Sequence, residues 1–370
     1  MKSFAQFKLL PTLQESLIQQ NFKTPTQIQI RTIPLLLAGH SVVGISETGS
    51  GKTMAYSLPI LHLLKNLENV GNPISEDSRP RAAIIVPTRE LGEQVARVIK
   101  SFTHVSRLRV RTILGGTKIE AVKRNISGQF EILIATPGRL VQLLDRGLIF
   151  LQDVQVLVFD EVDQMLDPGF LSDAKRIVNE CRPDRQMAMF SATISPEAQA
   201  LLTQLFDKAE VIRSEGSHRV VPTLVTQNRS VLNGKRFPLL EELLEKPVTG
   251  GTLIFTNTRK QCDILADLLL KSGKKCLIYR GEMNKGERRD NLKKFRNGQI
   301  ELLIATDLAA RGLDIEHVGR VINYHLPQDI ENYMHRVGRT ARAGKKGLVI
   351  NLVTERDENL IKRLEKIRSK

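Results

Sequence analysis

The chain has 370 residues, a formal net charge of +15, a hydrophobic content of 41% and three cysteines. This length accommodates two ordinary domains, and the composition is typical of a globular protein. The cysteines lie far apart with no C-x-x-C pair, which argues against a zinc site and a disulfide framework and favours a reducing compartment. No signal peptide is recognisable, and no apolar run approaches the ~20 residues of a membrane span. We therefore expect a cytoplasmic protein with no membrane partner.

The excess of basic residues has two interpretations. It can be a solvated surface that happens to be basic, or a surface for a polyanion, because lysines and arginines displace condensed counterions from phosphate backbones. Charge alone does not decide between them, and it does not distinguish RNA from DNA.

Short apolar runs alternate with stretches of helical period in the first part of the chain. Four runs are predicted to be buried parallel strands: residues 42–45, 82–86, 132–135 and 156–159. Amphipathic helices such as 91–102 lie between them. This alternation indicates β-α-β architecture.

The same pattern restarts in the second part of the chain. Its predicted strands are residues 253–255, 275–279, 302–305 and 320–323, with helices at 261–271 and 285–295. The segment 213–223, which contains Gly, Ser and Pro, separates the two sets. We therefore predict an α/β fold of two domains, 1–212 and 224–370, joined by a flexible linker at 213–223.

A phosphate-binding loop is predicted directly after the first strand. Residues 46–53 read SETGSGKT and open a helix, and glycines there let backbone N–H groups surround an anion at a helix N-terminus. Lys52 would reach the β- and γ-phosphates, and Thr53 would ligate Mg²⁺. The full pattern has Gly where this chain has Ser46. The alternative is a Gly-rich turn before a helix, which the strand–loop–helix context disfavours.

Three acidic residues, Asp160, Glu161 and Asp163, follow the apolar run 156–159. They could simply mark the start of the next helix. Beside a phosphate loop, however, an acid at the end of a parallel strand can hold Mg²⁺, usually through water. We predict that Asp160 holds the metal and that Glu161 orients and deprotonates the attacking water. Asp163 would be a cap or a partner for a basic or hydroxyl side chain.

In this order, the motifs resemble those of the DEAD-box family of ATP-dependent RNA helicases over nearly the whole chain. The acid tetrad is Asp-Glu-Val-Asp, with Val162 where the family name has Ala. The resemblance implies a minimal core of bacterial type made of two tandem RecA-like domains. It also implies ATP and Mg²⁺ as cofactors and RNA as the partner. We expect a monomer, and no protein partner can be read from the sequence.

The resemblance also assigns the ATP site. Phe4 and the segment 22–29, FKTPTQIQ, resemble the adenine-reading Q motif. Gln29 offers a donor and an acceptor, while Phe4 would stack on the base or be only a hydrophobic anchor. The implied ATP contacts are Phe4, Gln29, Ser46, Thr48, Gly49, Ser50, Gly51, Lys52, Thr53 and Asp314. The segment 335–344, HRVGRTARAG, resembles an arginine-finger motif, so the implied catalytic residues are Lys52, Glu161, Arg339 and Arg342.

RNA contacts are implied at loops that follow successive strands. The implied residues are Pro87, Thr88, Arg89, Gly116, Thr136, Gly138, Arg139, Arg259 and Thr306. Each loop alone is more readily a turn or a helix cap, but several basic loops at one sheet favour backbone binding. Residues implied to couple the two ligands are Asp163, Ser191, Thr193, His335 and Arg336. Ser191 and Thr193 could also cap the following helix.

We therefore expect an RNA-dependent ATPase that locally separates short duplexes and binds RNA largely without sequence preference. Two alternatives stay open: an ATP-gated RNA clamp with little unwinding, and a DNA-directed helicase of the same superfamily. Several positions depart from the family pattern, namely Ser46, Gly92, Val162, Lys285, His325 and Ala341. Lys285, His325 and Ala341 bear on how the second domain binds RNA and on domain closure.

Overall fold

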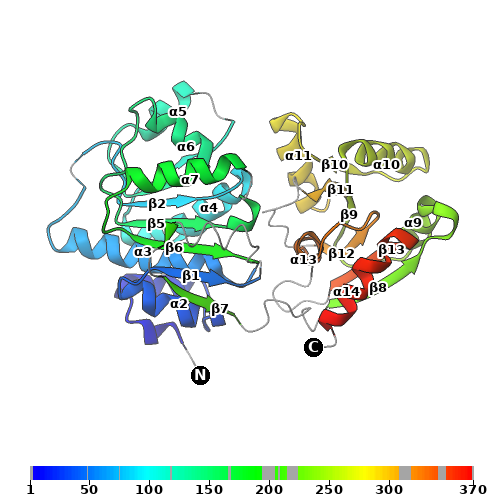
Figure 1. Cartoon of the computed structure of the whole chain (residues 1–370), viewed down its shortest axis with the longest axis horizontal. Coiled ribbons are helices and arrows are strands. Elements are labelled where there is room, and N and C mark those ends of the chain that lie inside the picture. Colours follow the sequence, from blue (N-terminus) through cyan, green and yellow to red (C-terminus); the bar gives the residue numbers. More distant parts are fainter. Residues whose placement is uncertain are drawn as a thin grey trace. The chain divides into compact units, whose positions relative to one another are not determined.

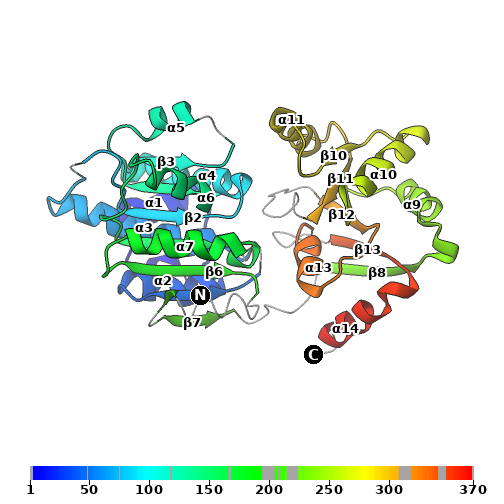
Figure 2. The same cartoon turned by 45° about the horizontal axis from the view of Figure 1, so that its top comes forward.

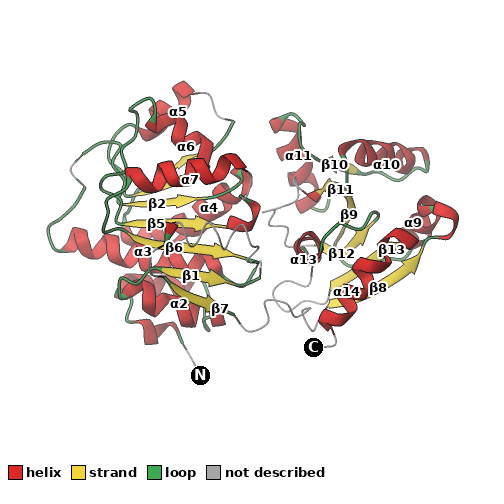
Figure 3. Ribbon diagram, in the orientation of Figure 1, coloured by secondary structure: helices red, strands yellow, loops and turns green. Residues whose placement is uncertain are grey.

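The computed structural model describes residues 3–47, 49–74, 76–116, 119–165, 168–193, 205–206, 209–214, 224–307, 318–340 and 347–368. The chain divides into two compact units, residues 1–217 and 218–370 (Figure 1). Each unit holds one parallel sheet with helices packed on it, so the predicted α/β fold is confirmed (Figure 3). No helix in these described ranges is long and apolar enough to cross a membrane.

The first unit is built on a seven-stranded sheet. Its strands are β1 (Val42–Ile45), β2 (Ala82–Ile85), β3 (Val110–Ile113), β4 (Ile132–Ala135), β5 (Val156–Asp160), β6 (Gln186–Ser191) and β7 (Glu210–Arg213). The strand order is β3-β4-β2-β5-β6-β1-β7, and the paired strands are parallel. Strand β7 ends at Arg213, one residue beyond the predicted end of the first domain. Residues 215–223 of the predicted linker lie outside the described residues.

Helices cover both faces of this sheet (Figure 2). One face is covered by α1 (Pro11–Gln19), α2 (Gln27–Leu37), α3 (Lys52–Asn69) and α4 (Arg89–Ser106), with the 3₁₀ turn η1 (Phe4–Phe7). The other face is covered by α5 (Ile119–Ile126), α6 (Pro137–Leu144) and α7 (Pro168–Glu180). Every residue of β1, β2, β4, β5 and β6 is buried, which explains why these strands appear as continuous apolar runs.

The second unit is built on a six-stranded sheet of order β10-β11-β9-β12-β13-β8. Its strands are β8 (Leu224–Ser230), β9 (Gly251–Thr256), β10 (Leu277–Tyr279), β11 (Leu302–Thr306), β12 (Val318–Asn323) and β13 (Gly347–Val353). Its helices are α9 (Arg236–Glu245), α10 (Arg259–Lys271), α11 (Lys285–Arg296), α13 (Ile330–Val337) and α14 (Glu358–Arg368). The 3₁₀ turns are η3 (Leu232–Gly234) and η5 (Glu355–Asp357), and η2 (Val162–Gln164) belongs to the first unit.

Close packing explains one departure from the family pattern. A Cβ atom built on Gly92 would lie 2.4 Å from Cδ2 of Leu114, so a larger residue there requires Leu114 to move. Leu114 follows β3 and is 5% exposed, which means that it fills the space above the start of α4. Gly92 therefore admits a core side chain, which offsets the helix propensity that it lacks.

Parallel strands bring their carboxyl ends to one edge of each sheet. In the first unit this edge carries the phosphate loop after β1, the acid tetrad after β5 and Ser191 at the end of β6. In the second unit the corresponding edge carries Thr258 after β9 and Asp307 after β11. The predicted functional residues of each unit therefore gather at one edge.

Candidate nucleotide and RNA sites

Two glycines of the phosphate loop lie in the left-handed region. The φ angles of Gly49 and Gly51 are +82° and +91°, and Gly51 is the N-cap of α3. Lys52 is the first residue of α3 and is 6% exposed, and its Nζ donates to the carbonyl of Ser46 at 2.7 Å. The hydroxyls of Ser46 and Ser50 share a hydrogen bond of 2.7 Å. The hydroxyl of Ser46, which the usual Gly of the full pattern would lack, therefore connects the start of the loop to Ser50.

Gln29 connects the Q motif to this loop. Its Oε1 accepts from the backbone N of Thr26 at 2.9 Å, and its Nε2 donates to the carbonyl of Gly51 at 3.0 Å. A Cβ on Gly51 would lie 2.4 Å from that Nε2, so the contact depends on glycine. Phe4 is 5% exposed and packs edge-on against Phe7, with ring centroids 5.9 Å apart. Phe4 is therefore a core residue, and its stacking on the base stays a prediction.

Asp160, the last residue of β5, is 2% exposed. Its Oδ2 accepts from the hydroxyl of Tyr56 at 2.7 Å, and its Oδ1 accepts from the backbone N of Glu161 at 3.0 Å. Burial, followed by the neighbouring charge of Glu161, raises the pKa of Asp160 to about 6. Lys52 opposes this shift, so its charge acts on Asp160. The phosphate loop and the acid tetrad thus form one electrostatic site.

Glu161 has an unusual backbone for its residue type. Its φ angle is +54°, in the left-handed region that non-glycine residues seldom adopt, and its side chain is 7% exposed. Gln164 donates from Nε2 to Oε2 of Glu161 in the turn η2. A strained residue next to a buried carboxylate is typical of a functional site.

The donors near Asp160 fit magnesium. No cluster of three His, Cys, Asp or Glu side chains that could hold a metal is found among the described residues. Mg²⁺ in nucleotide sites uses one or two protein oxygens, and phosphates and water supply the remainder. The hydroxyl of Thr53 and the carboxylate of Asp160 match that requirement.

Asp163 joins the tetrad to the end of β6. Its Oδ2 accepts from the backbone N atoms of Ala192 and Thr193 at 3.1 and 3.2 Å, and from the Thr193 hydroxyl at 3.4 Å. Its own backbone N donates to the hydroxyl of Ser191 at 3.3 Å. The structure therefore brings together the three first-domain residues that the sequence assigned to coupling. Residues 194–200, which the capping interpretation requires, lie outside the described residues.

Most of the predicted RNA residues of the first domain line one cavity of about 620 Å³. They are Pro87, Gly116, Thr136, Gly138 and Arg139. Gln164 of η2 also lines it, so the cavity lies beside the acid tetrad.

Thr88 and Arg89 have local partners. The hydroxyl of Thr88 caps α4 by accepting from the backbone N of Leu91 at 3.2 Å. The guanidinium of Arg89 pairs with Glu93 at 2.8 Å. Thr88 therefore caps α4 and places the charge of Arg89 at the start of the helix, while its RNA contact stays a prediction.

A second cavity, of about 530 Å³, lies in the second domain. It brings together Arg259 and Thr306, the two RNA residues predicted there, and adds Lys260, Asn257 and Asp307. Arg259 forms an ion pair with Glu282. Lys260 and Asp307 were not among the predicted residues, although each directly follows a predicted RNA residue.

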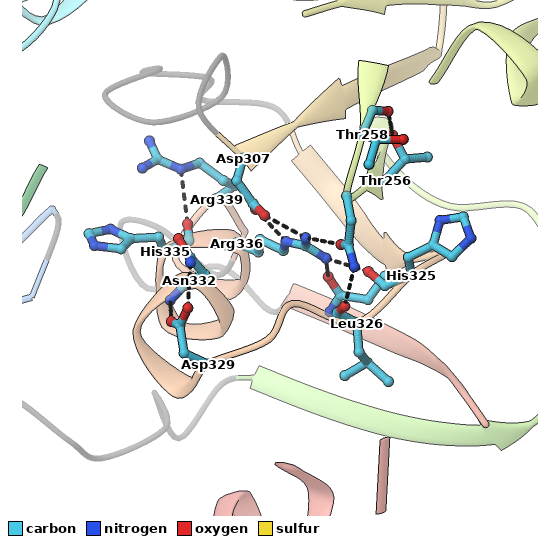
Figure 4. Close-up of polar contacts among 12 residues, drawn as sticks. Thr256, Thr258, Asp307, His325, Leu326, Asp329, Asn332, His335, Arg336 and Arg339 are labelled. Carbon is cyan, nitrogen blue, oxygen red and sulfur yellow. Dashed lines mark hydrogen bonds and ion pairs between the residues drawn. The ribbon is translucent and has the colours of Figure 1, made fainter. Parts of the chain in front are cut away.

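Arg336 is the buried centre of a polar network in the second domain (Figure 4). It is 1% exposed, and its guanidinium carbon lies 4.9 Å from the ring centroid of Phe255. Its N–H groups donate to both carboxylate oxygens of Asp307, the side chains of Asn257 and Asn323, and the carbonyl of His325. These five bonds use all the N–H donors of Arg336 within its own domain, and its coupling role stays a prediction.

The remaining predicted residues of this motif are only partly described. His335 and Arg339 are 6% and 3% exposed, and Nε of Arg339 donates to the carbonyl of His335 at 3.1 Å (Figure 4). Thr48, Asp314 and Arg342 lie outside the described residues.

Comparison with known proteins identifies the family. A model described as DEAD/DEAH box helicase matches residues 26–201, and one described as helicase conserved C-terminal domain matches residues 235–344. The DEAD-box ATP-dependent RNA helicase CshA of Geobacillus kaustophilus is 34% identical over 366 residues, covering 99% of this chain and 76% of its own length. The chain belongs to the DEAD-box family of RNA helicases.

Further similarities support this family and its fold. RNA helicase CrhR of Synechocystis is 35% identical and covers 98% of this chain and 72% of its own length. The structure of Saccharomyces cerevisiae Dbp5 bound to RNA and ADP BeF3 matches with a TM-score of 0.86 at 28% identity, covering 99% of this chain and 93% of Dbp5. The protein is thus an ATP-dependent RNA helicase with two tandem RecA-like domains.

Proposed function

We propose that ATP binds at the carboxyl edge of the first sheet and is hydrolysed there. Lys52 holds the β- and γ-phosphates, and Glu161 orients and deprotonates the attacking water. Thr53 and Asp160 hold Mg²⁺, which neutralises charge on the phosphates when it is bound. Arg339 and Arg342 stabilise the negative charge that develops in the transition state.

The link between the phosphate-loop helix and the buried carboxylate of Asp160 carries this proposal: Lys52 and Tyr56 both lie in α3, and the hydroxyl of Tyr56 donates to Asp160 at 2.7 Å. It means that the phosphate-loop lysine and the predicted metal acid act on the same small volume. Only one hydrogen bond of the Lys52 ammonium is described, so two of its three donors are available to phosphate oxygens.

RNA would lie along the two cavities, one in each domain. Their linings include threonine hydroxyls, glycines that permit close approach, and the arginines Arg139 and Arg259, which suit sugar–phosphate contacts. We therefore expect binding with little sequence preference, a strong dependence on salt, and selection of RNA over DNA through the 2′-hydroxyl. The predicted activity is the local separation of short duplexes.

The test is steady-state ATP hydrolysis with no nucleic acid, with single-stranded RNA and with DNA of matched sequence. RNA alone should stimulate hydrolysis, and Glu161→Gln should abolish it. Glu180→Gln, which changes a carboxylate of α7 paired with Arg176, is the matched control and should retain activity. Equal stimulation by DNA would refute RNA selectivity.

A strand-displacement assay on a short RNA duplex separates the helicase from the clamp. We expect ATP to be required for displacement. Hydrolysis that RNA stimulates without any displacement would favour the ATP-gated clamp.

A cytoplasmic, monomeric protein is also proposed. Burial raises the pKa of both Cys181 and Cys262 to about 12, and all three cysteines are free, as is usual for a reducing compartment. Size-exclusion chromatography with light scattering would check the oligomeric state.

A further inference from the structure

A buried tyrosine contacts one of the two residues assigned to the metal and shares a helix with the other. Tyr56 follows Thr53 by three positions in α3, so both side chains lie on one face of the helix. Tyr56 is 0% exposed, and its hydroxyl donates to Oδ2 of Asp160 at 2.7 Å. One hydroxyl therefore links the helix that opens the phosphate loop to the acid that ends β5.

The ring of Tyr56 is fixed by its surroundings. Its centroid lies 5.3 Å from that of Phe190, and Phe190 on β6 is the register partner of Asp160 on β5. Phe190 in turn packs against Gly44, where an added Cβ would lie only 2.6 Å from the phenylalanine ring. The ring of Tyr56 is thus packed against β6, and β6 against β1, which restricts movement of the hydroxyl away from Asp160.

We propose that Tyr56 is a positioning residue for Mg²⁺, acting through Asp160; this rests on the proposed metal role of Thr53 and Asp160. A buried carboxylate is costly unless it is hydrogen-bonded. The Tyr56 hydroxyl on Oδ2 and the Glu161 N–H on Oδ1 satisfy one lone pair on each oxygen and fix the plane of the group. The orientation of the remaining lone pairs of the Asp160 carboxylate is thereby fixed before nucleotide and metal bind.

Partners of this kind around metal ligands typically change metal affinity by 10–100-fold when they are removed. Tyr56→Phe removes only the hydroxyl and keeps the ring against Phe190. We expect the Mg²⁺ concentration at half-maximal binding of a fluorescent ADP analogue to rise roughly tenfold. Binding measured in EDTA should not change, and hydrolysis at saturating Mg²⁺ should approach the wild-type rate, because the defect lies in metal affinity.

The chain offers a matched control one residue away. The hydroxyl of Ser57 is buried in the same helical turn and has no hydrogen-bond partner in the described part of the chain. Ser57→Ala therefore removes a buried hydroxyl without removing a contact, and it should leave the Mg²⁺ midpoint unchanged. Thermal melts of both variants establish that each is folded.

A double-mutant cycle tests whether the effect passes through Asp160. Adding Tyr56→Phe to Asp160→Asn should raise the Mg²⁺ midpoint no further. The proposal is overturned if Tyr56→Phe has the wild-type midpoint, if its binding weakens equally in EDTA, or if the two changes are additive. A wild-type protein that binds nucleotide without regard to Mg²⁺ would instead refute the metal assignment itself, while RNA-stimulated hydrolysis would still test the proposed function separately.

Discussion

In each domain, charged motif residues lie at the carboxyl edge of that domain's own parallel sheet. The two domains differ in how many hydrogen bonds these residues already make within the protein. In the first domain Lys52 makes one described hydrogen bond, and Asp160 accepts one at each oxygen, so both groups keep capacity for a ligand. In the second domain Arg336 donates all five N–H groups to protein oxygens. A charged residue in a motif is therefore a candidate ligand only when its hydrogen-bonding capacity is not already filled.

Arg336 and Arg339 belong to one motif, but their substitution should affect different properties. The largest expected effect is that of Arg339 on the rate of ATP hydrolysis. We expect Arg339→Ala to slow RNA-stimulated hydrolysis about 10³-fold or more, because it removes a proposed arginine finger. Nucleotide affinity, measured at equilibrium, should change little. Arg363→Ala, on the exposed face of α14, is the control for lost positive charge in the same domain. A loss below about tenfold for Arg339→Ala would contradict the finger assignment.

Arg336 should instead act on stability. Arg336→Ala leaves the partly buried carboxylate of Asp307 and the buried amide of Asn323 without their partner, so we expect about 3 kcal/mol of destabilisation. Urea unfolding of the full chain measures this loss. Arg229→Ala breaks an exposed ion pair with Glu242 at 3.2 Å and should cost at most about 1 kcal/mol. Similar unfolding midpoints for Arg336→Ala and Arg229→Ala would show that the network is not structural.

The raised pKa of Asp160 predicts how metal binding varies with acidity in the first domain. The carboxyl group, whose pKa is about 6, must lose its proton before it can hold Mg²⁺. Mg²⁺-dependent nucleotide binding should therefore rise with pH up to about 6, roughly tenfold per unit well below it, and level off above. Glu180→Gln should preserve this profile, whereas Asp160→Asn should flatten it. A plateau that begins near pH 4 would mean that the pKa is not raised.

The sequence predicted the buried parts of the fold better than its edges. Strands β1, β2, β4 and β5 are continuous apolar runs because helices cover both faces of the sheet. The edge strand β8 reads LVTQNRS, and none of its residues is fully buried, so it gave no such signal. The acids at the end of β5 were predicted as functional residues because they directly follow this apolar run.

Contacts between distant segments could not be predicted in the same way. The bond from Arg336 to Asn257 joins residues 79 positions apart, and the bond from Tyr56 to Asp160 joins residues 104 apart. Neither pair has a spacing that marks it in the sequence. Only the spacing of Tyr56 from Thr53, which places them on one helical face, could have drawn attention to that hydroxyl.

The smallest expected effects concern a threonine helix cap that occurs in both domains. Thr88 and Thr258 each follow a strand, precede an arginine and cap a helix, accepting from the backbone N atoms of Leu91 and Gln261, both at 3.2 Å. Thr88→Ala and Thr258→Ala should each cost about 1 kcal/mol in unfolding free energy. The serine variants keep the cap and should recover most of that loss.

Measurements of RNA affinity then distinguish the role of the threonine cap from that of the arginine beside it. Because each arginine follows its cap directly, loss of the cap should weaken RNA binding only through fraying of the first helical turn. Arg89→Ala and Arg259→Ala remove a proposed phosphate contact and should also lower the dependence of affinity on salt, by a slope of about one each. If the threonine variants change that slope as much as the arginine variants do, the hydroxyls are part of the RNA contact and not only caps.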